Sequence, residues 1–145
     1  MAWFSGATVE ARYINLDRRL DRRGQFEKEI IDTKALGSVA IKRFRAFDEL
    51  KNGALGCARS HVAAMRECLL EPGRKPFLLI MEDDCQLEVP TAELFNIINK
   101  MPAPCDSGSP ILCLSYHPPR IQLQRVDSLL CFGSAVRATE IQTTS

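Results

Sequence analysis

The sequence predicts an α/β fold, a three-layer sandwich built on a mostly parallel sheet. Short apolar runs alternate with segments that carry apolar residues at helical spacing, in the order β-α-β-α-β-α-β. One apolar run, Phe77–Met81, leads directly into the acidic residues 82–84 and is typical of a strand buried on both faces. Polar or ionic side chains follow each expected strand, at the sheet edge where open α/β folds bind ligands.

The chain has 145 residues and is expected to form a single domain over residues 1–145. Hydrophobic residues make up 46% and charged residues 26%, as in ordinary globular proteins. The net charge of +1 does not favour binding to nucleic acid or a membrane surface. No apolar run approaches the ~18 residues of a transmembrane helix, and the start lacks the cationic flank of a secretory signal. We expect a cytoplasmic polypeptide, or a secretory-lumen setting if it is a fragment of a longer chain.

The six cysteines show no metal or disulfide pattern. They include no Cys-x-x-Cys pair, and most lie in apolar or helical stretches, at positions 57, 68, 85, 105, 113 and 131. We therefore expect free, largely buried thiols that serve packing, Cys57 among them.

The first strand is expected within Glu10–Leu16 and ends near Asn15. A highly charged turn over residues 17–23 follows it. A first helix is then indicated by the helical spacing of Phe26, Ile30 and Ile31. Gly37 is the expected end of that helix.

A second strand over residues 39–44 leads into Asp48, and a turn is expected at residues 51–53. The second helix is predicted from Leu55 to Leu70, with an apolar stripe formed by Leu55, Val62, Met65 and Leu69. Pro72 and Gly73 end it, and the strand Phe77–Met81 follows.

Thr91 is the expected N-cap of a third helix, whose apolar face consists of Leu94, Ile97, Ile98 and Met101. After a loop rich in proline, glycine and serine, Ile111–Leu114 is expected to form a fourth strand that ends near His117. Leu129–Phe132 could add one more strand.

The acidic residues Glu82, Asp83 and Asp84 repel one another, and a hard divalent cation such as Mg²⁺ or Mn²⁺ carrying a diphosphate would offset that repulsion. A solvated acidic turn is the alternative. Arginines such as Arg18 and Arg22 suit diphosphate oxygens, because a guanidinium donates two parallel hydrogen bonds. Their alternative role is a solvated helix start paired with the aspartates at positions 17 and 21.

Four sequence blocks resemble glycosyltransferase family 25, which includes lipopolysaccharide and collagen galactosyltransferases. The blocks are Tyr13–Arg18 with Asp21–Arg23, Phe44–Asp48, Gly56–His61 and Ile80–Asp84. Their order and spacing follow the family pattern INLD-x-x-x-DR, A-x-D, GC-x-x-SH and LEDD. The resemblance covers roughly residues 11 to 118.

The resemblance implies a GT-A-like (Rossmann-like) fold, a UDP-sugar donor, commonly UDP-galactose, and Mn²⁺ or Mg²⁺ as cofactor. It implies that Glu82 and Asp84 bind the metal. The residues expected to bind the nucleotide or its phosphates are Asn15, Arg18, Arg22, Asp48 and Ser60.

Family members invert the configuration at the anomeric carbon. A single displacement at that carbon is therefore expected, with the nucleoside diphosphate as the leaving group. A carboxylate or a histidine would remove the proton of the acceptor hydroxyl, and the candidates are His61 and Asp83. His61 could instead be a hydrogen-bonded core residue. His117 is either a loop residue or a further metal ligand.

Two function classes follow. The first is a glycosyltransferase that moves a hexose to a hydroxyl of a glycan or glycoprotein acceptor. The second is a non-catalytic domain that binds nucleotide or a partner protein, because family members usually continue into an acceptor-side portion that this chain is expected to lack. An exposed sheet edge would then favour a homodimer. A phosphatase or receiver-type domain ranks last, since it needs an acidic cluster where this chain has Asn15.

Overall fold

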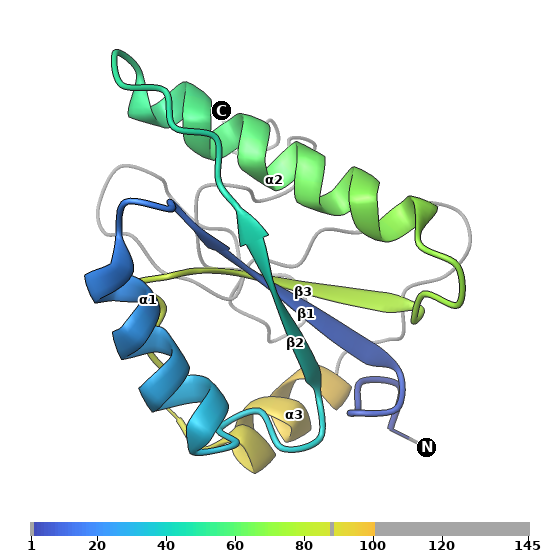
Figure 1. Ribbon diagram of the computed structural model, residues 1–145. Coiled ribbons are helices and arrows are strands. Elements are labelled where there is room, and N and C mark those ends of the chain that lie inside the picture. Colours follow the sequence, from blue (N-terminus) through green and yellow to red (C-terminus); the bar gives the residue numbers. More distant parts are fainter. Residues whose placement is uncertain (1, 88, 101–145) are drawn as a thin grey trace, which may run out of the picture. The chain divides into compact units, whose positions relative to one another are not determined.

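The computed structural model describes residues 2–87 and 89–100, which belong to a compact unit, Met1–Lys100. Its elements are β1 (Val9–Asn15), α1 (Leu20–Phe26), the π-helical η1 (Glu27–Asp32), β2 (Ala40–Arg45), α2 (Gly53–Leu70), β3 (Phe77–Glu82) and α3 (Thr91–Asn99) (Figure 1). The predicted α/β class and the predicted alternation are confirmed as far as α3. The strands expected at Ile111–Leu114 and Leu129–Phe132, together with His117, lie outside the described residues.

Within the described residues the sheet has three strands, all parallel, in the order β2-β1-β3. Ile14 of β1 lies opposite Phe44 of β2 on one side and Glu82 of β3 on the other. The chain therefore moves outward from β1 to β2 and then passes back across β1 to reach β3. This reversal makes β1 a topological switch point, and open α/β sheets bind ligands in the crevice outside such strand ends.

Helices α1 and α2 cover opposite faces of the sheet. Neighbouring residues of β1 point to opposite faces, so one strand contacts both helices. Tyr13 stacks on Phe26 of α1 with ring centroids 4.3 Å apart. Its neighbour Ile14 belongs to a hydrophobic cluster with Phe44 and Ala64, the last of which lies on α2. Side chains from one strand thus reach two separate helical layers.

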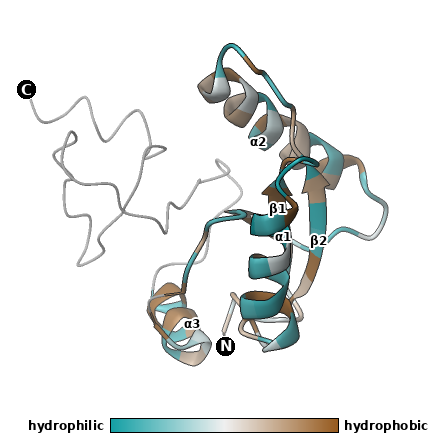
Figure 2. Cartoon of the chain, turned by 60° about the vertical axis from the view of Figure 1, so that its left-hand side comes forward, coloured by the Kyte–Doolittle hydropathy of each residue, from teal (hydrophilic) through white to brown (hydrophobic). Residues whose placement is uncertain are grey.

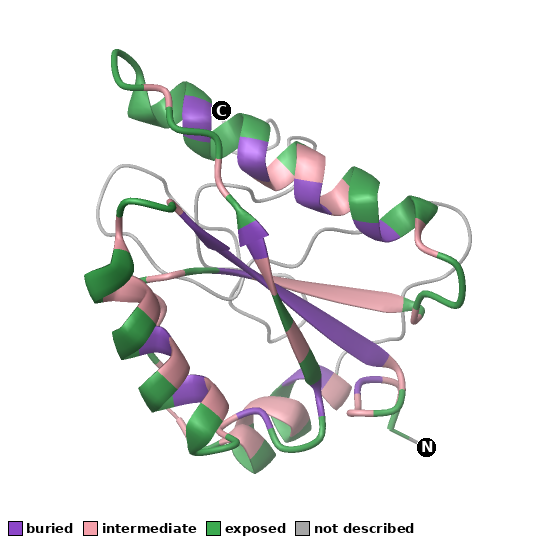
Figure 3. Ribbon diagram, in the orientation of Figure 1, coloured by how far each residue is buried: buried purple, intermediate pink, exposed green. Residues whose placement is uncertain are grey.

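The central strand is β1, and every one of its residues is buried (Figure 3). In β3, by contrast, Met81 is buried while residues 77–80 are half-buried. The prediction that Phe77–Met81 is buried on both faces is wrong for the described sheet, because β3 lies at its edge. The sequence pattern concealed the central strand, since β1 contains two buried charges, Glu10 and Arg12, whose side chains form an ion pair at 3.2 Å.

Helix α2 packs on the sheet through small residues. Its buried positions recur every fourth residue: Gly56, Ser60, Ala64 and Cys68. The predicted apolar stripe does not face the core, because Leu55, Val62 and Leu69 are exposed. The physical reason is the close approach of the helix: a Cβ atom on Gly56 would lie 2.7 Å from the carbonyl oxygen of Phe47.

Three predicted helix boundaries are corrected. Helix α1 begins at Leu20, inside the segment expected to be a charged turn, and the helical run ends with η1 at Asp32, ahead of Gly37. Pro90 rather than Thr91 occupies the N-cap of α3, which makes no side-chain capping bond.

The carboxamide of Asn99 anchors α3 to the amino-terminal segment through hydrogen bonds to the backbone N–H and carbonyl of Phe4. In Figure 2, α3 is coloured largely as hydrophobic, whereas most of α1 is coloured as hydrophilic.

Candidate functional site

The carboxyl edge of the sheet gathers the residues that the sequence singled out. All three strands are parallel, so the segments that follow them lie at the same edge. These segments and the adjoining helices carry Asn15, Arg18, Arg22, Asp48, Ser60, His61, Glu82, Asp83 and Asp84. Their contacts divide them into two groups, one on the α1 face and one on the α2 face.

Asn15 is a buried hydrogen-bonding centre at the end of β1. Its amide nitrogen donates to Asp83 Oδ2 at 2.7 Å and to the Arg19 carbonyl oxygen at 3.1 Å. Its Oδ1 accepts a hydrogen bond from Arg43 Nε at 3.0 Å. Both amide protons are therefore used within the protein, and Asn15 holds the Asp83 carboxylate in place.

Asp83 and Asp84 converge on one cationic nitrogen. Arg22 Nη1, from α1, lies 3.3 Å from Asp83 Oδ1 and 3.2 Å from Asp84 Oδ2. The Asp83 side chain is 9% exposed and the Asp84 side chain 56%. One carboxylate is thus fixed and largely shielded from solvent, whereas its neighbour is open to it.

The arginines after β1 have different partners. Arg18 Nε donates to Asp48 Oδ2 at 2.7 Å, which joins the loops after β1 and β2. Arg19 pairs with Asp21 and lowers the pKa of that carboxyl group. The pairing expected for a solvated helix start is therefore present at Asp21.

Asp17, by contrast, pairs with the β2 side chains Arg43 and Arg45, and the Arg43 hydrogen bond holds its pKa below the ordinary value.

Ser60 is fully buried and joins α2 to the loop after β2. Its Oγ accepts a hydrogen bond from the backbone N–H of Phe47 at 2.9 Å and donates to the Gly56 carbonyl oxygen at 2.6 Å. In this structure the hydroxyl group positions the helix and does not point into solvent.

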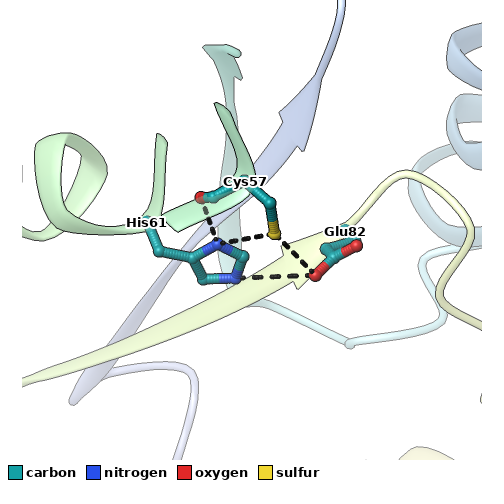
Figure 4. A group of neighbouring side chains, drawn as sticks. All are labelled: Cys57, His61 and Glu82. Atoms are coloured by element: carbon teal, nitrogen blue, oxygen red, sulfur yellow. Dashed lines mark hydrogen bonds and ion pairs between the residues drawn. The ribbon is translucent and has the colours of Figure 1, made fainter. Parts of the chain in front are cut away.

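The second group lies where the amino-terminal half of α2 meets the end of β3 (Figure 4). Cys57 Sγ is 3.6 Å from His61 Nδ1 and 3.6 Å from Glu82 Oε1. His61 Nε2 is 3.8 Å from the same Glu82 oxygen. Glu82 and Asp83 are therefore neighbours in sequence whose carboxylates serve opposite faces of the sheet.

The packing role predicted for Cys57 is wrong, because this thiol is exposed. A signal was present in the sequence: a cysteine and a histidine four residues apart share one face of a helix. Partial shielding of the Cys57 sulfur from water raises the pKa of this thiol, and the Glu82 carboxylate raises it further. A protonated thiol is a weak nucleophile, so the trio is not arranged as an activated cysteine.

Two depressions lie elsewhere in the described part of the chain. One, of about 490 Å³, is lined by residues between 30 and 41, from the end of η1 through the following loop to the start of β2, and the other, of about 580 Å³, runs beside α2 near Phe47 and Leu70. Neither is lined by Asn15, Glu82 or Asp83. The candidate site is therefore defined here by its side-chain chemistry.

No protein-family model, curated protein or solved structure matches this chain. The resemblance to glycosyltransferase family 25 accordingly rests on the four sequence blocks. Among residues 2–87 and 89–100, no helix is both long enough and apolar enough to cross a membrane.

Proposed function

We propose that this chain is a metal-dependent, inverting glycosyltransferase with a GT-A-like fold. It would transfer a hexose, galactose by the family resemblance, from a UDP-sugar to a hydroxyl group of a glycan or glycoprotein. The observation that carries the proposal is the convergence of Asp83 and Asp84 on Arg22, beside Asn15 and at the switch point of the sheet.

The carboxylates of this group suit a hard divalent cation. Mn²⁺ and Mg²⁺ prefer oxygen ligands, and the exposed Asp84 carboxylate offers one. The Arg22 nitrogen between Asp83 and Asp84 marks a position at which positive charge is favourable. Glu82, the other expected ligand, turns toward Cys57 and His61, so we assign the supporting carboxylate to Asp83.

A bound divalent ion would offset the charge that develops on the departing diphosphate. The chain's own cations would share that task. Arg22 and Arg18 have side chains that are 40% and 58% exposed, so either guanidinium can exchange its carboxylate partner for a phosphate oxygen. Asp48, next to Arg18 in the loop after β2, would accept a hydrogen bond from the ribose or the base.

The candidates for the base that takes the acceptor proton differ in accessibility. Each oxygen of Asp83 already accepts a hydrogen bond, one from Asn15 and the other from Arg22. His61 is 32% exposed and stands beside Glu82. An acceptor hydroxyl therefore reaches His61 more readily than Asp83, whose carboxylate is also the one assigned to support the metal.

Calorimetric titration of UDP into the full chain, with Mn²⁺ and then with EDTA, tests the proposal. We expect binding that requires Mn²⁺. Asp84→Asn should weaken it by at least about 10-fold with an unchanged circular dichroism spectrum, because it removes a charged ligand from an exposed position. Asp32→Asn, an equal loss of charge at the exposed end of η1, is the matched control and should leave the affinity unchanged.

If UDP binds equally well in EDTA, the proposed metal dependence is wrong. If Asp84→Asn binds UDP with unaltered affinity, the proposed role of the acidic motif is wrong. A folded sample that binds no UDP under either condition would contradict the glycosyltransferase function. Transfer from UDP-galactose to a sugar acceptor, measured on a chain that does bind, separates an enzyme from a nucleotide-binding domain.

A further inference from the structure

We propose that Cys57, His61 and Glu82 form a second metal site, for Zn²⁺, on the α2 face of the sheet. This site goes beyond the proposed sugar transfer, whose metal uses the oxygen ligands on the α1 face. A zinc-bound His61, with its other ring nitrogen donating to the Cys57 carbonyl, would not also serve as the base for the acceptor hydroxyl. Figure 4 shows the three side chains directed toward one another from the amino-terminal half of α2 and the end of β3.

The donor atoms are already close to the spacing that zinc requires. One sulfur, one ring nitrogen and one carboxylate oxygen can be chosen so that all lie within 4.8 Å of one another. Zinc bonds these ligand types at about 2.0–2.3 Å in tetrahedral geometry, which places neighbouring donors roughly 3.3–3.6 Å apart. The observed 3.6 Å from Cys57 Sγ to Glu82 Oε1 meets that spacing, and 3.8 Å from His61 Nε2 to the same oxygen is close to it.

The histidine is oriented in the way that metal-binding histidines commonly are. His61 Nδ1 lies 3.0 Å from the backbone carbonyl oxygen of Cys57. A carbonyl oxygen only accepts hydrogen bonds, so it favours the tautomer that carries its proton on Nδ1. The lone pair is then on Nε2, the nitrogen that faces Glu82, and a backbone carbonyl is a frequent outer partner of a metal-ligating histidine.

Packing of α2 fixes where the two helical ligands stand. Gly56 and Ser60, each one residue before a ligand, are buried against the loop after β2. Cys57 and His61 are four residues apart and therefore share the adjoining face of the helix. Because Glu82 is the last residue of β3, the site joins two elements whose relative position the core determines.

The ligand chemistry selects the ion. Thiolate and imidazole favour zinc over Mg²⁺ and Mn²⁺, which take oxygen ligands. Three protein ligands leave a fourth tetrahedral position open, as in zinc sites that bind water or a substrate. The acidic motif would thus supply its first carboxylate to a zinc site and its remaining two to a hard-cation site.

Cobalt titration of the metal-free, reduced full chain tests the site, because tetrahedral Co²⁺ reports both geometry and thiolate ligation in its absorption spectrum. We expect one equivalent of Co²⁺ to produce visible tetrahedral bands and a sulfur-to-cobalt charge-transfer band, both abolished by added Zn²⁺. Cys57→Ser should remove the charge-transfer band, and His61→Gln should weaken Co²⁺ binding by at least about 10-fold. The exposed position of Cys57 makes the serine variant compatible with folding.

Two controls make the result specific. Cys85→Ser alters a half-buried thiol beside the acidic motif and should retain the charge-transfer band. Asp84→Asn should also retain it while losing Mn²⁺-dependent UDP binding, so the two proposals can fail separately. The zinc site is overturned if the folded wild-type chain shows no tetrahedral spectrum, or if the charge-transfer band persists in Cys57→Ser.

Discussion

Glu82 and Asp83 show how strand alternation divides a motif that reads as one unit in the sequence. The Glu82 carboxylate contacts Cys57 and His61 on the α2 face, whereas Asp83 accepts a hydrogen bond from Asn15 on the α1 face. The sequence predicts that acids follow a strand at the ligand-binding edge. It does not reveal which acid serves which face, because that depends on the helices packed against the strand.

Tyr13 gives a residue-level test of the buried layer between β1 and α1. Its hydroxyl group donates to Glu27 Oε1 at 2.7 Å, and its ring is almost fully buried. Burial and the Glu27 carboxylate together raise the pKa of Tyr13 from 10.0 to about 12. Tyr13→Phe removes this hydrogen bond and should lower the free energy of unfolding by about 1 kcal/mol at neutral pH.

The pH dependence follows from the direction of that shift. Because the folded state holds the phenolic proton more tightly than the unfolded state, the contribution of Tyr13 is complete below pH 10.0 and is lost as the pH rises toward about 12. Urea unfolding at a series of pH values should show the wild-type advantage over Tyr13→Phe declining across that interval. An advantage that stays constant to pH 12 would contradict the assignment.

Helix α2 shows what apolar periodicity detects and what it misses. The predicted range, Leu55–Leu70, is close to the observed Gly53–Leu70, because long runs of helix-forming residues are recognisable from the sequence. The buried face was not recognised. It is defined by small residues that allow close approach, such as Gly56 and Ser60, which a search for large apolar side chains passes over.

Two glycines provide a matched test of that packing. Gly56→Ala should lower the free energy of unfolding by about 1–3 kcal/mol, since its Cβ would lie 2.7 Å from the Phe47 carbonyl oxygen and the helix would have to move. Gly24→Ala, within α1, meets no atom within 4 Å and should raise that energy by about 0.5–1 kcal/mol. Chemical denaturation of both variants measures the contrast, and equal effects of the two substitutions would argue against a close contact at Gly56.

The limits of apolar patterns also explain why the burial of β3 was predicted wrongly. The apolar run Phe77–Met81 predicted a strand buried on both faces. The strand that is buried throughout is instead β1, although it contains the charged residues Glu10 and Arg12. These charges are buried because they pair with each other, and Arg12 also pairs with Glu71 beyond the end of α2. Partners so distant along the chain cannot be read from local pattern.

At the scale of the whole molecule, the sequence predicted that the candidate residues lie at one edge of the sheet. It did not predict which of them contact one another, because those contacts depend on how the helices pack. Cys57 was missed because a thiol in a helix usually serves packing. Three of the four family-like blocks contain the end of a strand and the start of the segment that follows it, and the fourth, Gly56–His61, lies in the amino-terminal half of α2.

The compact unit Met1–Lys100 should fold without the rest of the chain. Its elements supply buried side chains to both faces of the sheet. A fragment of residues 1–100 should therefore unfold cooperatively with urea, as followed by circular dichroism. A fragment of residues 1–90, which lacks α3, its fully buried Ile98 and the bonds from Asn99 to Phe4, should be less stable by at least about 2 kcal/mol. A gradual, non-cooperative transition of the longer fragment would show that the unit is incomplete.

The strand order affects the order in which the strands can pair while the chain is being synthesised. Ile14 pairs with Phe44 on one side and with Glu82 on the other, more than twice as far along the chain. Each doubling of a loop adds about 0.6 kcal/mol to the entropy cost of closing it, so the β1–β2 pair should form first. Until β3 leaves the ribosome, β1 would keep one edge of unpaired amides and carbonyls exposed. A nascent chain paused between β2 and β3 is therefore the intermediate most open to chaperone capture or to pairing with another chain.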